Sequence, residues 1–198
     1  MTRSVPVTLL ALGLALGALP CVAAAQWGVS AEIGVARFSG TSRDSGGATV
    51  GPYRPTTFAV RFDRGDGPVR VALDVLYAEP GLAGEQGDVA FVQYGVVSLW
   101  EIAPQVALRL ARFGAGVEAR IEAGPAFDLW NFDGDQRNRV GGRAAAVVQW
   151  PLARALMGSF RVTGVWTGSV FDPGDTPSGV ERRATRRFGV ALGLRYRL

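Results

Sequence analysis

The 198-residue sequence contains no histidine, a single cysteine and no lysine, because all 21 of its basic residues are arginine. The lack of histidine excludes acid–base catalysis through an imidazole, and with one cysteine it also excludes zinc sites built from histidine and cysteine. A single cysteine also excludes a disulfide within the chain. These absences remove several large classes of enzyme and metalloprotein before any motif is considered.

Long hydrophobic runs are scarce, although 48% of the residues are hydrophobic. One apolar stretch, 5–19, follows Arg3 and ends in three alanines before Gln26, which is the pattern of a secretory signal. We therefore expect residues 1–25 to be a cleaved signal peptide and residues 26–198 to form one domain. After the signal, no apolar stretch is long enough for a membrane-spanning helix.

The formal net charge is only +4, and the arginines are spread along the chain rather than clustered. A nucleic-acid-binding protein would show a basic patch, so we expect no nucleic-acid partner.

Apolar and polar residues alternate along most of the chain after residue 26. In the last segment Phe188, Val190 and Leu192 occupy one set of alternate positions, and Arg187 and Arg195 occupy the other. Successive side chains of a β-strand point to opposite faces, so this segment is predicted to be a strand with one apolar and one polar face. Helical spacing would scatter the same charges around a cylinder.

The alternation predicts eight strands, near 27–38, 56–63, 69–78, 95–110, 117–130, 140–150, 156–170 and 184–198. The odd-numbered connections are long and rich in Gly, Asp, Pro, Ser and Arg: 39–55, 79–94, 131–139 and 171–183. The other connections are short turns built from Gly and Pro. Even strand number, short turns at one end and long loops at the other predict an all-β fold, an eight-stranded antiparallel up-and-down transmembrane β-barrel.

The apolar face of these strands faces lipid in a membrane barrel and the interior in a soluble one. The polar face is rich in small residues such as Ser30, Gly34 and Thr57, which suits a narrow barrel interior. Aromatic residues gather near both strand ends: Trp27, Phe62, Phe113, Trp150 and Tyr196 on the turn side, and Phe38, Phe58, Tyr77, Tyr94, Phe127 and Phe171 on the loop side. Two such belts favour the membrane barrel, with a soluble secreted ligand-binding barrel as the alternative.

With the apolar face outward, charges of both signs face the interior. The predicted ion-pair network comprises Glu32, Arg61, Arg70, Asp74, Glu101, Arg109, Glu118, Arg120, Glu122, Arg143, Arg161 and Arg195. Asp63, Gln105, Asp128, Gln149 and Arg197 are expected on the same face. Isolated buried charges are too costly to persist, so we expect Arg–carboxylate pairs that plug the interior. The alternative is a narrow channel for ions or small solutes.

Two short segments, Leu99–Pro104 (LWEIAP) and Glu122–Ala126 (EAGPA), resemble segments of the OmpA/OmpX-like eight-stranded outer-membrane barrels, the porin-like outer membrane protein beta-barrel domain family. The resemblance covers 26–198 and implies a place in the outer membrane, contact with its lipid and insertion by the outer-membrane assembly machinery. Many members have no known activity. The family commonly ends in an aromatic residue, whereas this chain ends in Leu198 with Tyr196 two residues earlier.

Barrels of this type that act on lipids or peptides place an essential histidine in the active site, so we expect no enzymatic activity. Glu118 and Glu122 are four residues apart on one strand face, but Arg120 lies between them, which indicates an ion-pair ladder rather than a glycosidase pair. No phosphate- or dinucleotide-binding fingerprint is present, and no cofactor is expected.

Asn131, Asp133 and Asp135, around Gly134, look like a fragment of a calcium loop. The same residues are typical of turns for backbone reasons, and we expect no metal site.

The expected loops carry several charged residues, namely Arg43, Asp44, Arg137, Arg139, Arg182 and Arg183. These side chains either contact lipopolysaccharide phosphates or a partner surface, or are solvated. The sequence thus predicts a structural or surface-interaction protein that acts through four extracellular loops, and it identifies no specific partner.

Overall fold

The computed structural model describes residues 27–39, 42–43, 49–65, 67–86, 89–172 and 182–198. The expected signal peptide and Asp44 lie outside the described residues. Within the described part, no helix is long and apolar enough to cross a membrane.

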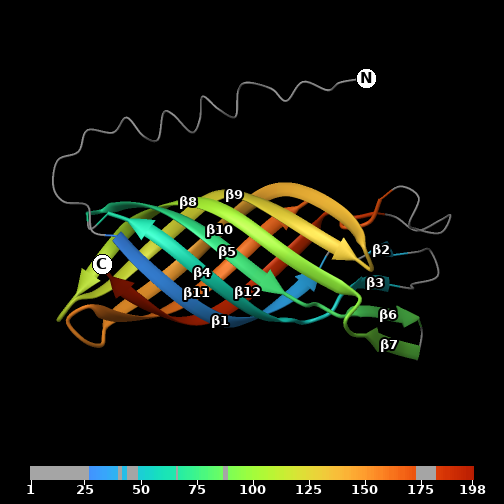
Figure 1. Cartoon of the computed structure of the whole chain (residues 1–198), viewed down its shortest axis with the longest axis horizontal. Helices are drawn as coiled ribbons and strands as arrows, with labels where there is room; N and C mark the ends of the chain where they lie inside the picture. The colour runs from blue at the N-terminus through green and yellow to red at the C-terminus, as the bar shows by residue number, and fades with distance from the viewer. Residues whose placement is uncertain (1–26, 40–41, 44–48, 66, 87–88, 173–181) are drawn as a thin grey trace, which may run out of the picture.

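Eight antiparallel strands close into a barrel in the order β1-β12-β11-β10-β9-β8-β5-β4, with β4 paired back to β1 (Figure 1). The barrel strands are β1 (Trp27–Ser39), β4 (Thr56–Arg64), β5 (Val69–Ala78), β8 (Val97–Phe113), β9 (Val117–Phe132), β10 (Asp135–Pro151), β11 (Leu156–Thr167) and β12 (Thr185–Arg197). The predicted fold class and strand number are confirmed.

The two ends of the barrel differ. The short connections β4–β5, β8–β9 and β10–β11 lie at one end, here called the turn end, where β1 begins and β12 finishes (Figure 1). The opposite end, here called the loop end, carries the remaining connections. The Leu198 amide donates to the Trp27 carbonyl oxygen (2.9 Å), so the two ends of the described chain are joined at the turn end.

A second sheet at the loop end was not predicted. It has the order β2-β3-β6-β7, from β2 (Ser42–Arg43), β3 (Thr49–Pro52), β6 (Leu82–Gln86) and β7 (Val89–Gln93) (Figure 1). The expected loops 39–55 and 79–94 therefore contain strands that pair with each other. These strands are only 2 to 5 residues long, too short for a readable alternation, and β3 pairs with β6 across the two connections.

The predicted long loop 131–139 is wrong, because β9 and β10 continue as one hairpin to a two-residue turn. Asp133 and Gly134 both have positive φ (49° and 98°), as a tight hairpin turn of this kind requires. The Gly134 amide donates to the Asn131 side-chain oxygen (2.8 Å). The turn geometry accounts for the residues that look like a calcium-loop fragment, and no group of three metal-ligating acidic side chains occurs in the described part of the chain.

The distribution of side chains is inverted relative to a soluble protein. Large apolar residues on the outer wall are exposed, for example Leu192 at 59% and Trp100 at 49%. Charged residues on the inner wall are buried, for example Arg120 at 1% and Glu101 at 0%. Alternation along the strands produces both effects at once, since each residue and its neighbour point to opposite sides.

An apolar cluster, here called the cap, fills the interior at the loop end. Its buried members are Phe38, Val97, Leu99, Trp130 and Val170, with Leu82, Val96, Phe132 and Phe171 packed against them. The prediction that Phe38 and Phe171 belong to an outer aromatic belt is therefore wrong. Phe38 has the same strand parity as Glu32 and points inward, where its ring meets that of Trp130 edge-on at 5.5 Å between centroids.

We expect Gly141→Ala to destabilise the barrel, because a Cβ there would overlap the Trp166 carbonyl oxygen on the paired strand β11. The adjacent Gly142→Ala is the matched control, since no atom lies within 4 Å of its Cβ position. We expect a loss of about 1–3 kcal/mol for the first variant and a change near zero for the second, from urea-unfolding midpoints. Equal midpoints for both variants would contradict the close approach of β10 and β11.

Candidate functional site

The interior of the barrel is the candidate site. The structure places all twelve residues of the predicted network on the inner wall, and every one except the half-buried Arg109 is buried. The other residues expected on that face, Asp63, Gln105, Asp128, Gln149 and Arg197, also point inward. The network divides along the barrel axis into a central group, a turn-end group and a loop-end group.

Glu122 on β9 is at the centre of the middle group. Arg61 on β4 donates to it through two parallel hydrogen bonds, Nη1–Oε2 and Nη2–Oε1, both 2.8 Å. Arg161 on β11 donates to the same carboxylate and also to Glu32 on β1 (Nε–Oε2 2.9 Å). One carboxylate thus joins strands on opposite sides of the closed barrel, and the planar guanidinium supplies the required fork of donors.

Asp74 on β5 extends the middle group. It accepts from Arg61 (3.1 Å) and the Gln105 amide (2.7 Å), and it forms an ion pair with Arg143 (2.9 Å). Each of these partners comes from a different strand, so Asp74 ties together β4, β8 and β10 from inside the barrel.

Glu118 on β9 organises the turn-end group with four arginines around it. Arg112 and Arg120 make the shorter contacts (2.6 and 2.7 Å), and Arg109 and Arg70 the longer ones (3.3 and 3.4 Å). Four guanidinium groups share one carboxylate, so this end of the interior has an excess of positive charge.

A separate pair closes the same end between β4 and β12. Asp63 receives a two-pronged contact from Arg195, with Nη2–Oδ1 at 2.6 Å and Nε–Oδ2 at 2.8 Å. Both side chains are 2% exposed, so water screens this pair weakly.

The loop-end group lies directly beneath the cap. Glu101 on β8 accepts from Arg143 and from Arg187, and Asp128 lies across from it on the neighbouring strand β9. Arg143 contacts both Glu101 and Asp74, so it links the loop-end group to the middle one.

Two arginines of the network, Arg187 and Arg112, are missing from the predicted ion-pair set, and for different reasons. The sequence places Arg187 on the polar face of the last strand, together with Arg195, so the alternation alone was sufficient to include it in the ion-pair network. Arg112 lies in line with the apolar face of β8, but the pairing of β8 with β9 shifts by one residue between Arg109 and Ala111. That bulge places Arg112 on the same side of the sheet as Glu118, at the turn-end opening where its side chain is 58% exposed, and alternation gives no sign of it.

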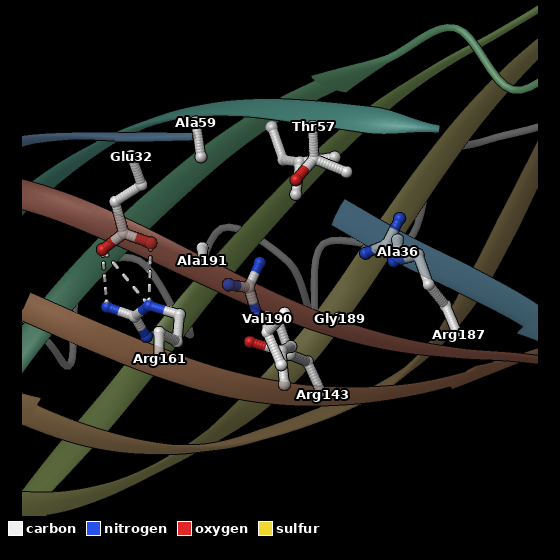
Figure 2. A pocket seen from close by; sticks show the side chains of 12 residues that line it. Glu32, Ala36, Thr57, Ala59, Arg143, Arg161, Arg187, Gly189, Val190 and Ala191 are labelled. Carbon is white, nitrogen blue, oxygen red and sulfur yellow. Dashed lines mark hydrogen bonds and ion pairs between the residues drawn. The ribbon is translucent and has the colours of Figure 1, made fainter. Parts of the chain in front are cut away.

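A small cavity remains inside the barrel between the middle and loop-end groups, with a volume of about 30 Å³. Figure 2 shows Glu32 joined to Arg161 on one side of it, with Arg143 and Arg187 on the other. This volume is on the scale of one or two water molecules. The cavity is therefore too small for an organic solute.

The loop arginines divide into two kinds. Arg139 pairs with Asp172 (2.7 Å) and donates to the Ser169 carbonyl oxygen, and Arg137 lies over the Phe132 ring at 4.4 Å. Arg137 also donates to the Val170 carbonyl oxygen (3.3 Å), so both arginines fasten the connection between β11 and β12 to β10. Arg182 and Arg183 are exposed, and nothing is described of the Arg43 side chain.

Comparisons with known proteins identify a likeness of fold. No protein-family model matches the chain, and no curated protein is significantly similar to it in sequence. The crystal structure of Neisserial surface protein A (NspA) matches with a TM-score of 0.60 and 13% identity, over 86% of this chain and 96% of that one. The outer membrane protein OprG from Pseudomonas aeruginosa matches with a TM-score of 0.56 and 12% identity, over 88% of this chain and 96% of that one. The chain therefore has the fold of the eight-stranded antiparallel outer-membrane β-barrels.

Proposed function

We propose that this protein is a non-enzymatic outer-membrane barrel with a closed interior and a structural or surface-interaction role at its loop end. The observation that carries the proposal is the inverted wall, with buried Arg–carboxylate pairs inside and exposed apolar side chains outside. In this proposal residues 1–25 direct export, the assembly machinery inserts 26–198, and the loop end faces outward, as is usual for barrels with long outer loops.

The outer wall argues against the soluble secreted barrel. Large apolar residues stand exposed on every barrel strand, including Ile33, Phe58, Leu73, Trp100, Leu129, Val148, Phe160 and Leu192. Soluble monomers rarely expose contiguous apolar patches beyond a few hundred Å². Hydrocarbon contact accounts for such a band, because lipid tails are as apolar as the side chains.

The inner layers argue against the narrow channel. A solute entering at the loop end meets the cap, where Leu99 and Trp130 are 0% and 1% exposed. Beyond the cap it meets guanidinium groups already bound to carboxylates on opposite walls. Eight strands enclose room for little more than side chains, and the 30 Å³ cavity agrees with that limit.

The charged side chains are poor candidates for catalysis. Glu118 and Glu122 are each held by at least two arginines, which leaves neither carboxylate available as a general acid or base. The chain also has no histidine to activate a nucleophile.

Surface recognition is assigned to the loop end as a whole. The second sheet and the β9–β10 hairpin both lie there, and the edge strands of the sheet offer backbone groups to a partner (Figure 1). Cell fractionation tests the location: recovery with the outer membrane, with heat-modifiable migration on a gel, is the expected result. Recovery in the soluble periplasm would defeat the proposal.

The closed interior predicts that purified protein in a planar bilayer shows no large, stable pore. A 16-stranded porin recorded under the same conditions is the positive control. Steady conductance on the scale of that porin would contradict the plugged interior.

We expect Glu122→Gln to destabilise the barrel by about 3–5 kcal/mol, because it leaves Arg61 and Arg161 buried with less negative charge than they need. Asp172→Asn is the matched control: it alters an ion pair whose acidic side chain is 52% exposed, where the expected change is within about 0.5 kcal/mol. Urea-unfolding midpoints in detergent provide the measurement. A small effect at Glu122 would show that the central pairs do not hold the barrel together.

A further inference from the structure

The outer wall over β12, β1 and β4 carries an apolar groove. Its volume is about 480 Å³, and it is lined by Ile33, Gly34, Val35, Thr56, Phe160, Val190, Ala191 and Leu192. The strand register explains the hollow: Thr56, Val35 and Val190 are neighbours across three strands and form a row of small outward side chains. Towards the turn end, the next outward row is larger and includes Phe58, Ile33, Leu192 and Phe160.

Arginines stand immediately beyond this groove towards the loop end. Arg37 is the next outward residue after Val35 on β1, and Arg186 on β12 lies opposite Ser39, two positions further. The Ala36 amide donates to the Pro55 carbonyl oxygen (3.0 Å), which continues the β1–β4 ladder and places Arg54 beside Arg37. All three arginines are exposed.

In the part of the chain that the structure describes, no carboxylate pairs with any of these three arginines. None of Arg37, Arg54 and Arg186 makes an ion pair or side-chain hydrogen bond among the described residues, unlike the arginines inside the barrel. Glu79 lines the same surface hollow as Arg54, but it accepts from the Tyr77 hydroxyl and makes no ion pair with the three arginines. Like charges on neighbouring strands are destabilising unless an anion lies between them.

Their height on the wall identifies the kind of anion. Trp166 pairs with Arg186 across the β11–β12 ladder and is 52% exposed, and Tyr94, which lines the same surface hollow as Arg54, is 71% exposed. Exposed aromatic rings of this kind mark the boundary between hydrocarbon and headgroups. From Arg37 down to Ile33 is four residues, or roughly 13 Å of strand, which spans the step from headgroup to upper acyl chain.

We propose that this wall binds one phosphate-bearing acyl lipid of the outer leaflet, of the lipopolysaccharide class. The arginines contact its phosphate groups through charge-assisted hydrogen bonds, and the groove receives an acyl chain. The inference rests on the proposed function, since it requires the loop end to face outward from an outer membrane. In this proposal the lipopolysaccharide contacts lie on the barrel wall rather than on the loops.

The test uses the purified barrel in a maltoside detergent, with diphosphoryl lipid A as the probe and native mass spectrometry to count bound lipid. We expect wild type to bind one lipid A, and Arg37→Gln with Arg186→Gln to weaken binding about tenfold or more, because charge-assisted contacts are lost. The matched control is Arg64→Gln with Arg154→Gln, which removes the same charge at the turn end and is expected to bind as wild type.

Two further arms separate the parts of the site. Val35→Trp fills the groove and is expected to weaken lipid A binding, whereas Val148→Trp, on the outward face of β10, is not. Dephosphorylated lipid A is expected to bind about tenfold more weakly than the diphosphoryl form. Heat-modifiable migration checks that each variant is folded.

Three results would overturn the inference: no lipid A bound to wild type, equal affinity in the Arg37/Arg186 variant, or displacement of lipid A by inorganic phosphate. The last result would assign the arginines to free phosphate rather than to a lipid. A failure here in a protein that still fractionates with the outer membrane and shows no conductance removes the lipid site alone. Recovery of wild type in the soluble periplasm removes the proposed function itself.

Discussion

Nearly all of the charges that point into this barrel lie within hydrogen-bonding distance of an opposite charge, and the rest of the structure depends on that pairing. The interior is too narrow for the charges to be hydrated separately, and the cost of an unpaired buried ion is several kcal/mol. Glu122 shows how this pairing acts at a distance, since it binds Arg61 from β4 and Arg161 from β11. Such contacts form only when the sheet is closed, so pairing and closure stabilise each other.

The interior is closed by two layers that work in different ways. Towards the turn end and in the middle, paired guanidinium and carboxylate groups fill the space. At the loop end the cap excludes water by packing, with Phe38 against Trp130 and Phe132 against Phe171. An apolar layer over a charged one also keeps solvent away from the Glu101 pairs beneath it, which strengthens their attraction.

The sequence was sufficient to predict strand number, antiparallel order and which side chains point inward, because all of these follow from a period of two. It was not sufficient to predict partners, since Arg61 and Glu122 are 61 residues apart and meet only through the shear of the closed barrel. Arg112 was missed because one bulge reverses the parity of β8 beyond Arg109. The second sheet was missed because its strands are short and pair across separate connections.

Arginine occurs in two environments in this chain, and the contrast between them supports a binding role for the outer wall. Inside, Arg61 and Arg161 are buried and each is matched by carboxylates. Outside, Arg37 and Arg186 are exposed at the rim of an apolar band and are matched by none among the described residues. An arginine facing bulk water needs no partner, but one at the edge of a hydrocarbon-facing groove, level with the exposed ring of Trp166, lies where phosphate headgroups stand. Inside the barrel, carboxylates of the chain supply the negative charge that pairs with arginine. On the outer wall, in our proposal, the phosphate groups of a bound lipid supply it.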